Sequence, residues 1–199
     1  MATAVASLYN TLPTLGDADD KFIHREATFE KLIGLFKKYD YEWGLCLVHV
    51  HCNLEAGELM LANGNISNPS EASVDSQHVF PERWLCNGKA YEFTTKHTRS
   101  PPVELVDEFR SLTGANPVLG LYYSGGQGTD DGLVSLERTE GRSNITDPVQ
   151  FGDVPSNSIQ TAWLPGSINP IQMACTIWCD MRTTRTSSSH KDTRTHRKD

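Results

Sequence analysis

The sequence lacks the features that would place it in several classes of protein. It has no run of about 20 consecutive apolar residues, which a membrane-spanning helix requires. Its first 20 residues, MATAVASLYNTLPTLGDADD, contain no basic start followed by an apolar core, so we expect no secretory signal. We therefore expect a cytoplasmic protein without a membrane partner.

Cysteine is scarce and odd in number. The five cysteines are Cys46, Cys52, Cys86, Cys175 and Cys179. Without a secretory signal, such a set favours free, buried thiols over a disulfide framework. Cys175 and Cys179 lie four residues apart, but the chain has no second pair that would complete a zinc site. The sequence alone therefore gives these two cysteines no role.

Positive charge is scarce outside the C-terminal end. The formal net charge is −7, yet residues 182–199 hold six Lys/Arg against two Asp, which leaves −11 on the rest of the chain. An acidic body repels phosphate groups, so we expect no nucleic-acid partner. The tail is polar and rich in Ser, Thr and Arg, which is typical of a solvated or loosely ordered chain end.

Two helices and several strands are predicted from the spacing of apolar residues. Residues 19–39 and 101–114 each place apolar side chains on one helical face, with Asp19 and Asp20 near the positive end of the first helix and Gly114 at the end of the second. Two strands follow each helix, and further strands complete the pattern. The predicted strands are 43–51, 57–64, 91–95, 117–124, 133–140, 159–164 and 173–179.

A shift of 79 residues brings identical residues into register. Seven identities fall within the 32 positions from 54 to 85, where average composition would give roughly two. The identical pairs are Leu54 and Leu133, Glu58 and Glu137, Asn65-Ile66 and Asn144-Ile145, Pro69 and Pro148, and Trp84-Leu85 and Trp163-Leu164. A repeat of this kind indicates an internal duplication.

The repeat predicts an α+β fold of two duplicated αββ units, whose antiparallel sheet carries two helices on one face. The predicted organisation is an N-terminal segment (1–18), a first half (19–98), a second half (99–181) and the basic polar tail (182–199). A ligand cleft is expected between the halves, on the sheet faces opposite the helices.

The stretch GLCLVHVHC suggests what lines that cleft, because side chains on a strand alternate between its faces. One face is apolar and suits a helix; it carries Cys46, Val48, Val50 and Cys52. The other face is expected to line the cleft; it carries Trp43, Leu45, Leu47, His49 and His51. The corresponding strand of the second half contributes Tyr122, Tyr123 and Ser124.

We assign candidate roles from these positions. His49, His51 and Tyr122 are the candidate catalytic residues, because imidazoles exchange protons near neutral pH. The candidate ligand-binding residues combine aromatic faces with carboxylates. They are Trp43, Glu58, Trp84, Tyr123, Glu137 and Trp163.

His49 and His51 are also candidate metal ligands, since imidazoles two residues apart on a strand can reach one ion. Further ligands are not fixed by local spacing; the candidates are Glu55, Glu58, His78, His97 and Glu137. A phenol and a hydroxyl in the second half are poor ligands for zinc or iron. The sequence therefore allows a divalent metal as cofactor but favours hydrogen-bonded histidines that line a polar cleft.

Four stretches, LVHVHCNLEAGELMLANGN, FPERWLCNGKAYEFT, VLGLYY and LERTEGRSNIT, resemble a group of uncharacterised proteins from filamentous fungi. The resemblance covers roughly residues 20–180 and implies a eukaryotic, non-secreted protein. It transfers no activity and no catalytic residue. Two functions stay open: a domain that binds a small molecule in the cleft, either as a binding protein or as an acid–base or metal-dependent enzyme, and a non-catalytic protein-interaction module.

Overall fold

The computed structural model describes residues 2–71, 78–126, 132–165 and 173–181. The helices in these parts are α1 (Ala2–Tyr9), α2 (Leu15–Lys21), α3 (Arg25–Lys38), α4 (Val103–Leu112) and the 3-10 helix η1 (Phe151–Asp153). The strands are β1 (Trp43–Leu47), β2 (Glu58–Asn63), β3 (Ile66–Glu71), β4 (Phe80–Leu85), β5 (Ala90–Thr94), β6 (Leu119–Tyr123), β7 (Leu133–Glu140), β8 (Ser143–Gln150), β9 (Ile159–Pro165) and β10 (Met173–Cys179). The predicted tail, 182–199, lies outside the described residues, as does most of the Gly-rich connection before β7.

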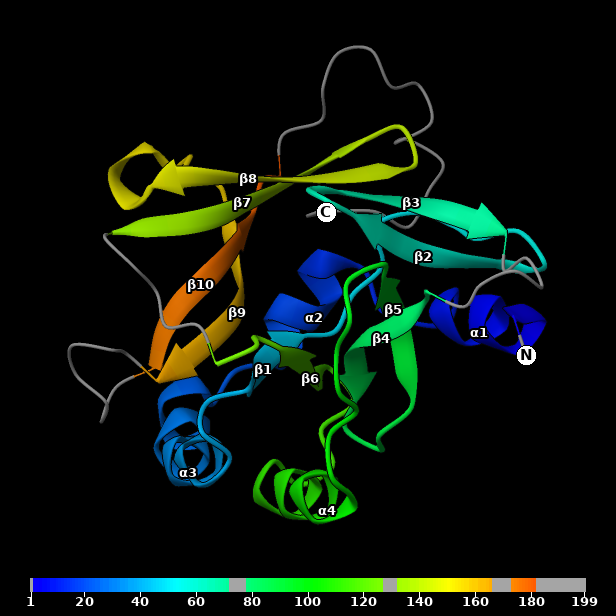
Figure 1. The fold of residues 1–199 in the computed structure, drawn as a ribbon. Coiled ribbons are helices and arrows are strands. Elements are labelled where there is room, and N and C mark those ends of the chain that lie inside the picture. Colours follow the sequence, from blue (N-terminus) through cyan, green and yellow to red (C-terminus); the bar gives the residue numbers. More distant parts are fainter. Residues whose placement is uncertain (1, 72–77, 127–131, 166–172, 182–199) are drawn as a thin grey trace.

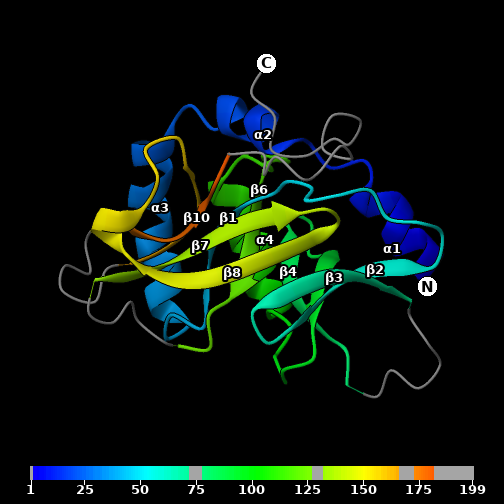
Figure 2. The same cartoon turned by 90° about the horizontal axis from the view of Figure 1, so that it is seen from above.

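The described strands close into a single barrel (Figures 1 and 2). Around the ring they follow the order β1-β6-β4-β5-β2-β3-β8-β7-β10-β9, and β9 pairs with β1 to complete it. The pairings β2·β5 and β7·β10 are parallel, and the other pairings in the ring are antiparallel. Closure pairs the backbone groups that an open sheet would leave exposed along its edges.

The predicted α+β fold with an open antiparallel sheet is therefore wrong. Three strands that complete the ring, β3, β4 and β8, were not predicted. In β3 (ISNPSE) and β8 (SNITDPVQ), Asn, Ser and Pro are typical of turns, and pairing with neighbouring strands overrides that local preference. Pairing of β3 with β8 then joins the hairpin β2–β3 to the hairpin β7–β8, with Ile66 opposite Ile145.

The predicted αββ units do not exist as separate layers, because the two predicted halves interlock. Strand β1 pairs with β6 and β9, which both belong to the second half, and β6 pairs with β1 and β4 of the first half. The ring order is unchanged when each of β1–β5 is exchanged with the strand five places later. However, the hairpin turns at Gly64 and Gly141 lie 77 residues apart and not 79.

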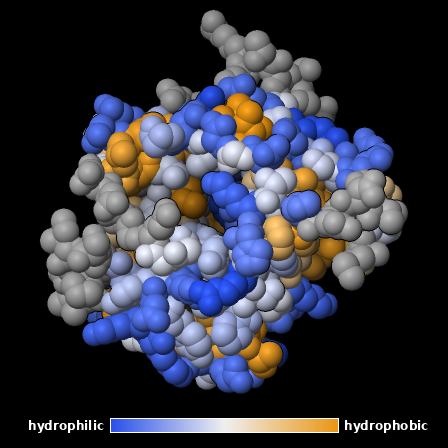
Figure 3. Space-filling model, in the orientation of Figure 1, coloured by the Kyte–Doolittle hydropathy of each residue, from blue (hydrophilic) through white to orange (hydrophobic). Residues whose placement is uncertain are grey.

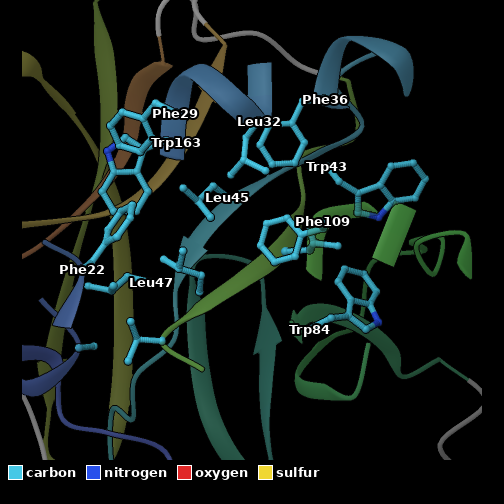
Figure 4. Close-up of a cluster of buried hydrophobic side chains, with 14 of the residues drawn as sticks. Phe22, Phe29, Leu32, Phe36, Trp43, Leu45, Leu47, Trp84, Phe109 and Trp163 are labelled. Atoms are coloured by element: carbon cyan, nitrogen blue, oxygen red, sulfur yellow. The ribbon is translucent and has the colours of Figure 1, made fainter. Parts of the chain in front are cut away.

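Helices α2, α3 and α4 cover the outside of the barrel around β1, β6 and β9, and an apolar core fills the space between (Figures 1 and 4). Trp163 of β9 contacts Phe22 and Phe29, with ring centroids 5.7 and 5.5 Å away. Trp43 and Trp84 belong to the same core, as does Phe109 of α4. Each of these large side chains contributes about 1.5–3 kcal/mol through burial.

The assignment of the two faces of β1 is corrected by this core. Trp43, Leu45 and Leu47 pack toward the helices, whereas we had expected them to face a cleft. Cys46, expected to face a helix, instead packs with Tyr122. The reason is that a closed barrel places its helices outside, so the large apolar side chains of β1 point outward.

The predicted helix 19–39 is two helices, α2 and α3, with a break at 22–24. Thr14 caps α2 by accepting a hydrogen bond from the backbone N–H of Asp17 at 3.2 Å, so α2 begins before the predicted start. An ion pair between Arg25 and Asp19 spans the break. Among the described helices, none combines the length and the apolar character needed to cross a membrane.

Candidate functional site: the barrel lumen

The lumen of the barrel contains a pocket with a volume of about 770 Å³. Every described strand except β1 contributes residues to its wall, which places the pocket inside the ring and not on its outer surface. The face in Figure 3 is hollowed near its centre, and hydrophilic side chains border the hollow. The volume lies within the usual range for pockets that hold small molecules.

Three charged residues form the floor of this pocket. Arg83 of β4 lies between two carboxylates: its Nε is 3.2 Å from Glu92 Oε2, and its Nη2 donates a 2.6 Å hydrogen bond to Glu137 Oε1. All three residues are buried, with exposures of 7% for Arg83, 7% for Glu92 and 2% for Glu137. Burial of charge is costly unless the charges are paired, and this arrangement pairs one guanidinium with two carboxylates.

His49 and His51 lie beneath that floor, in the segment that follows β1. Both are fully buried, and their ring centroids are 4.7 Å apart. His51 Nε2 is 3.7 Å from Glu92 Oε1 and 3.9 Å from Glu137 Oε2, and the side-chain amide of Asn144 is 3.5 Å away. Neither histidine contributes to the wall of the lumen pocket.

The N-terminal segment fixes the position of the histidines. Tyr9 of α1 accepts a 3.0 Å hydrogen bond from the backbone N–H of His51, and Val50 N–H donates to the Pro13 carbonyl at 3.0 Å. Tyr9 also belongs to a second apolar core, together with Val50 and Tyr91 of β5. The segment that sequence reasoning left without a role therefore holds part of the candidate site in place.

The histidines, Glu137 and Cys179 form a cluster of metal-ligand atoms. One ligand atom from each residue lies within 4.8 Å of all the others, and all four residues are buried. Glu137 and Cys179 stand opposite each other in the parallel pairing of β7 with β10, so their side chains share a face. Glu137 thus belongs both to the pocket floor and to the cluster beneath it.

Burial dominates the protonation of these groups. It lowers the pKa of His49 to about 4, although Glu137 acts in the opposite direction, so this imidazole is neutral at pH 7. It raises the pKa of Glu92 to about 7 against the opposing effect of Arg83. Burial also holds the pKa of the Cys179 thiol well above its ordinary value. Burial thus favours the neutral forms of His49, Glu92 and Cys179.

The remaining sequence-predicted residues divide between the lumen and the outer core. Tyr122 and Tyr123 line the lumen pocket, and the Tyr122 hydroxyl lies 3.0 Å from Thr176 Oγ1. Burial raises the pKa of Tyr122, and its hydroxyl is not brought to the histidines by any described contact. We therefore find no shared catalytic geometry for Tyr122 with His49 and His51 among the described contacts.

The three candidate tryptophans, Trp43, Trp84 and Trp163, lie in the outer core and not on the wall of the lumen pocket. Glu58 also lies outside that wall, where it pairs with Arg142. Of the five proposed additional metal ligands, Glu137 alone joins the described cluster with the histidines.

Sequence reasoning missed Arg83, Glu92, Asn144 and Cys179. A signal for two of them was present: Arg83 and Glu92 are charged residues inside short strands whose neighbours, Trp84 and Tyr91, are buried aromatic residues. On one strand this alternation is equally typical of a solvent-facing position. Only the closed ring turns such a position into the interior.

Comparison of the chain with protein-family models, curated proteins and solved structures gives no match, so the resemblance to fungal proteins stays a prediction and the functional argument depends on geometry.

Proposed function

We propose that this protein binds a small polar molecule, rich in hydroxyl or amino groups, in the lumen of its barrel. The observation that carries this proposal is the lumen pocket of about 770 Å³ with a buried, charged floor. Binding, not acid–base catalysis by His49 and His51, is the function that the geometry supports, because the two imidazoles lie beneath the floor and outside the pocket wall.

The wall of the pocket favours a ligand that makes many hydrogen bonds. Hydroxyl groups of Tyr123, Ser135 and Thr146 line it from the three strands β6, β7 and β8. A lipid chain would leave such groups without partners, which costs about 1–3 kcal/mol for each buried group. A polyol, a sugar or an amino alcohol offers donors and acceptors that match this wall.

The charge of the pocket disfavours anions. Among the described residues that line it, three carboxylates, those of Glu82, Glu92 and Glu137, stand against the one guanidinium of Arg83. That guanidinium is already held between two of the carboxylates. Above the raised pKa of Glu92, which is about 7, a carboxylate or phosphate ligand would therefore meet repulsion, whereas a neutral or cationic ligand would not.

The test is a binding screen on the full chain. Polyols, sugars, amino alcohols and polyamines should raise Tm and give saturable heats in calorimetry, with shifts of roughly 5 °C or more near saturation. Fatty acids, dicarboxylates and phosphate esters serve as comparison ligands and should give no shift. Binding of the comparison classes in place of the polar ones would contradict the proposed ligand chemistry.

Two variants show where a positive ligand binds. Ser135→Phe places a ring on the wall of the lumen and should abolish binding. Ser111→Phe makes the same substitution at an exposed position of α4 and should leave binding intact. If no ligand binds, or if both variants bind equally well, the lumen is not a small-molecule site, and the alternative of an interaction module gains support.

A further inference from the structure

We infer that His49, His51, Glu137 and Cys179 form a binding site for one divalent transition-metal ion of the zinc type. The site lies beneath the floor of the lumen pocket and deepens the proposed binding site, since Glu137 belongs to both. The inference does not require that the lumen bind a small molecule, because His49, His51 and Cys179 do not line the pocket.

The spacing of the ligand atoms is the first observation. A tetrahedral zinc site with bonds of 2.0–2.3 Å separates its ligand atoms by roughly 3.3–3.8 Å. Here the four ligand atoms lie within 4.8 Å of one another, so an approach of about 1 Å would complete the geometry. His49 and His51 lie outside the strands of the barrel, so this approach does not require any strand pairing to change.

The orientation of His49 is the second observation. Its Nδ1 lies 2.9 Å from the carbonyl oxygen of Leu47. A carbonyl can only accept a hydrogen bond, so Nδ1 carries the proton and, in the neutral ring, Nε2 carries the lone pair. Histidine ligands in metal sites are commonly held by this kind of hydrogen bond from the other ring nitrogen to a carbonyl.

The carboxylate of Glu137 is the third observation. Its Oε1 accepts the hydrogen bond from Arg83, and its Oε2 is 3.9 Å from His51 Nε2. Within the described part of the chain, Oε2 is fully buried and has no hydrogen-bond partner. A buried carboxylate oxygen without such a partner is costly, and coordination to a metal ion removes that cost. Arg83 then acts as the outer partner that orients this ligand.

The charges of the cluster are the fourth observation. Glu92 and Glu137 with Arg83 between them carry a net charge of −1 when both carboxylates are ionised. On coordination, the sulfur of Cys179 forms a bond to the metal and releases its proton to solvent, which brings the charge to −2. A divalent cation therefore makes this buried group neutral.

The ligand set indicates the class of ion. Two imidazole nitrogens, one carboxylate oxygen and one thiolate suit zinc and its spectroscopic substitute cobalt. Magnesium and calcium require ligands that are almost all oxygen. Four protein ligands are typical of a structural site without an open position, so the ion would clip the segment after β1 to strands β7 and β10.

The test uses Co²⁺ as the probe on the purified full chain, first treated with a chelator and a thiol reductant. One equivalent of Co²⁺ should give the intense visible bands of a tetrahedral site and a thiolate-to-cobalt charge-transfer band in the near ultraviolet. Competition with Zn²⁺ should remove both. Elemental analysis after reconstitution with Zn²⁺ should give about one ion per chain, and the ion should raise Tm by roughly 5–10 °C when present at about 100 times its Kd.

Variants assign the bands to this cluster. Cys179→Ser should abolish the charge-transfer band, and His49→Ala and Glu137→Gln should each weaken Co²⁺ binding at least tenfold. Cys175→Ser is the matched control, because Cys175 lies on the same strand but outside the cluster, and it should keep the band. A variant with both His190→Ala and His196→Ala tests for binding by the tail and should bind as the original does. Circular dichroism and thermal melting check that each variant folds.

Several outcomes would overturn the inference. The reconstituted chain could hold no metal, its Co²⁺ spectrum could lack a thiolate band, or the band could persist in Cys179→Ser. Cys179→Ser could fail to fold. In that case the site is ruled out if the single variants Glu137→Gln and His49→Ala both keep the complete Co²⁺ absorption spectrum. Small-molecule binding in the screen above is measured on chelator-treated protein. The two tests are therefore independent, and a negative result in one does not change the interpretation of the other.

Discussion

Two glutamate–arginine pairs in this barrel look alike in the sequence and differ in their surroundings. Glu58 of β2 pairs with Arg142 nearer the surface, where the two side chains are 15% and 40% exposed. Glu137 of β7 pairs with Arg83 inside the lumen, where the two side chains are 2% and 9% exposed. Each glutamate stands on the first strand of a hairpin, and each pair connects segments far apart in the chain.

Because the residue types are the same in both pairs, burial decides how much each ion pair contributes to stability. In a pair that water can reach, the attraction between the charges only replaces their interaction with water. Such a pair contributes about 0–1 kcal/mol to stability. In a buried group, the attraction between the charges offsets the cost of removing them from water only while every partner is present. Loss of one partner therefore lowers the free energy of unfolding much more.

Removal of the buried guanidinium should produce the largest effect. Arg83→Met leaves the carboxylates of Glu92 and Glu137 facing each other without a cation, and we expect a loss of about 3–5 kcal/mol in the free energy of unfolding at pH 7. Arg142→Met, the matched change in the exposed pair, should cost about 1 kcal/mol or less. Guanidinium chloride unfolding of both variants measures the contrast. Equal losses would show that the two pairs do not differ as their burial implies.

The buried group should also make stability depend on pH through Glu92. In the metal-free protein its pKa is raised from 4.5 to about 7, chiefly by burial, so the folded state binds a proton that the unfolded state has lost between these pH values. Stability from this group is therefore present below about pH 4.5 and is lost as the pH rises toward 7.

Glu92→Gln is neutral at every pH and should remove that loss. The free energy of unfolding of the variant, relative to that of the original chain, should be higher at pH 8 than at pH 5 by about 1–3 kcal/mol. Urea unfolding at the two pH values, with a chelator present, measures this difference. A constant difference between the two proteins across the range would mean that Glu92 is ionised throughout.

The segment that holds the histidines depends on a neutral contact, and its removal should have an intermediate effect. Tyr9→Phe deletes the hydroxyl that accepts the buried N–H of His51, which should cost about 1–2 kcal/mol. Tyr39→Phe is the control, because the Tyr39 ring packs against Trp43 outside the lumen and should tolerate the change. Thermal unfolding compares the two variants; equal behaviour would remove Tyr9 from the support of the site.

Particular strands show how much of this structure the sequence could predict. The bounds of β7 and β10 were predicted correctly, because glycines directly precede and follow β7, and β-branched and apolar residues dominate β10. Strand β3 was missed, since its Asn, Pro and Ser form a strand only when β2 and β8 pair with it. The closed ring itself depends on pairings between distant strands, such as β1 with β9, which no local pattern encodes.

The candidate site divides in the same way. His49, His51 and Glu137 could be named from their chemistry alone. Cys179 could not, because a single cysteine acquires a partner only through the parallel pairing that places it opposite Glu137. Arg83 lies on β4, a strand that was not predicted, so its inward direction was hidden as well. Local periodicity thus finds the groups, and the long-range register decides which of them meet.

The partly exposed pair of Glu58 with Arg142 should show the smallest effect, and its contribution to stability depends on pH in the opposite direction to that of Glu92. The hydrogen bond from Arg142 lowers the pKa of Glu58, so its contribution to stability is present above its ordinary pKa of 4.5 and is lost as the pH falls through the folded value. Glu58→Gln should therefore cost about 1 kcal/mol or less at pH 7, and the cost should vanish toward pH 3. Addition of 1 M salt should also reduce it, since exposed charges are screened. Urea unfolding across pH and salt checks both trends, and a cost that persists at low pH would show that Glu58 contributes through packing and not through its charge.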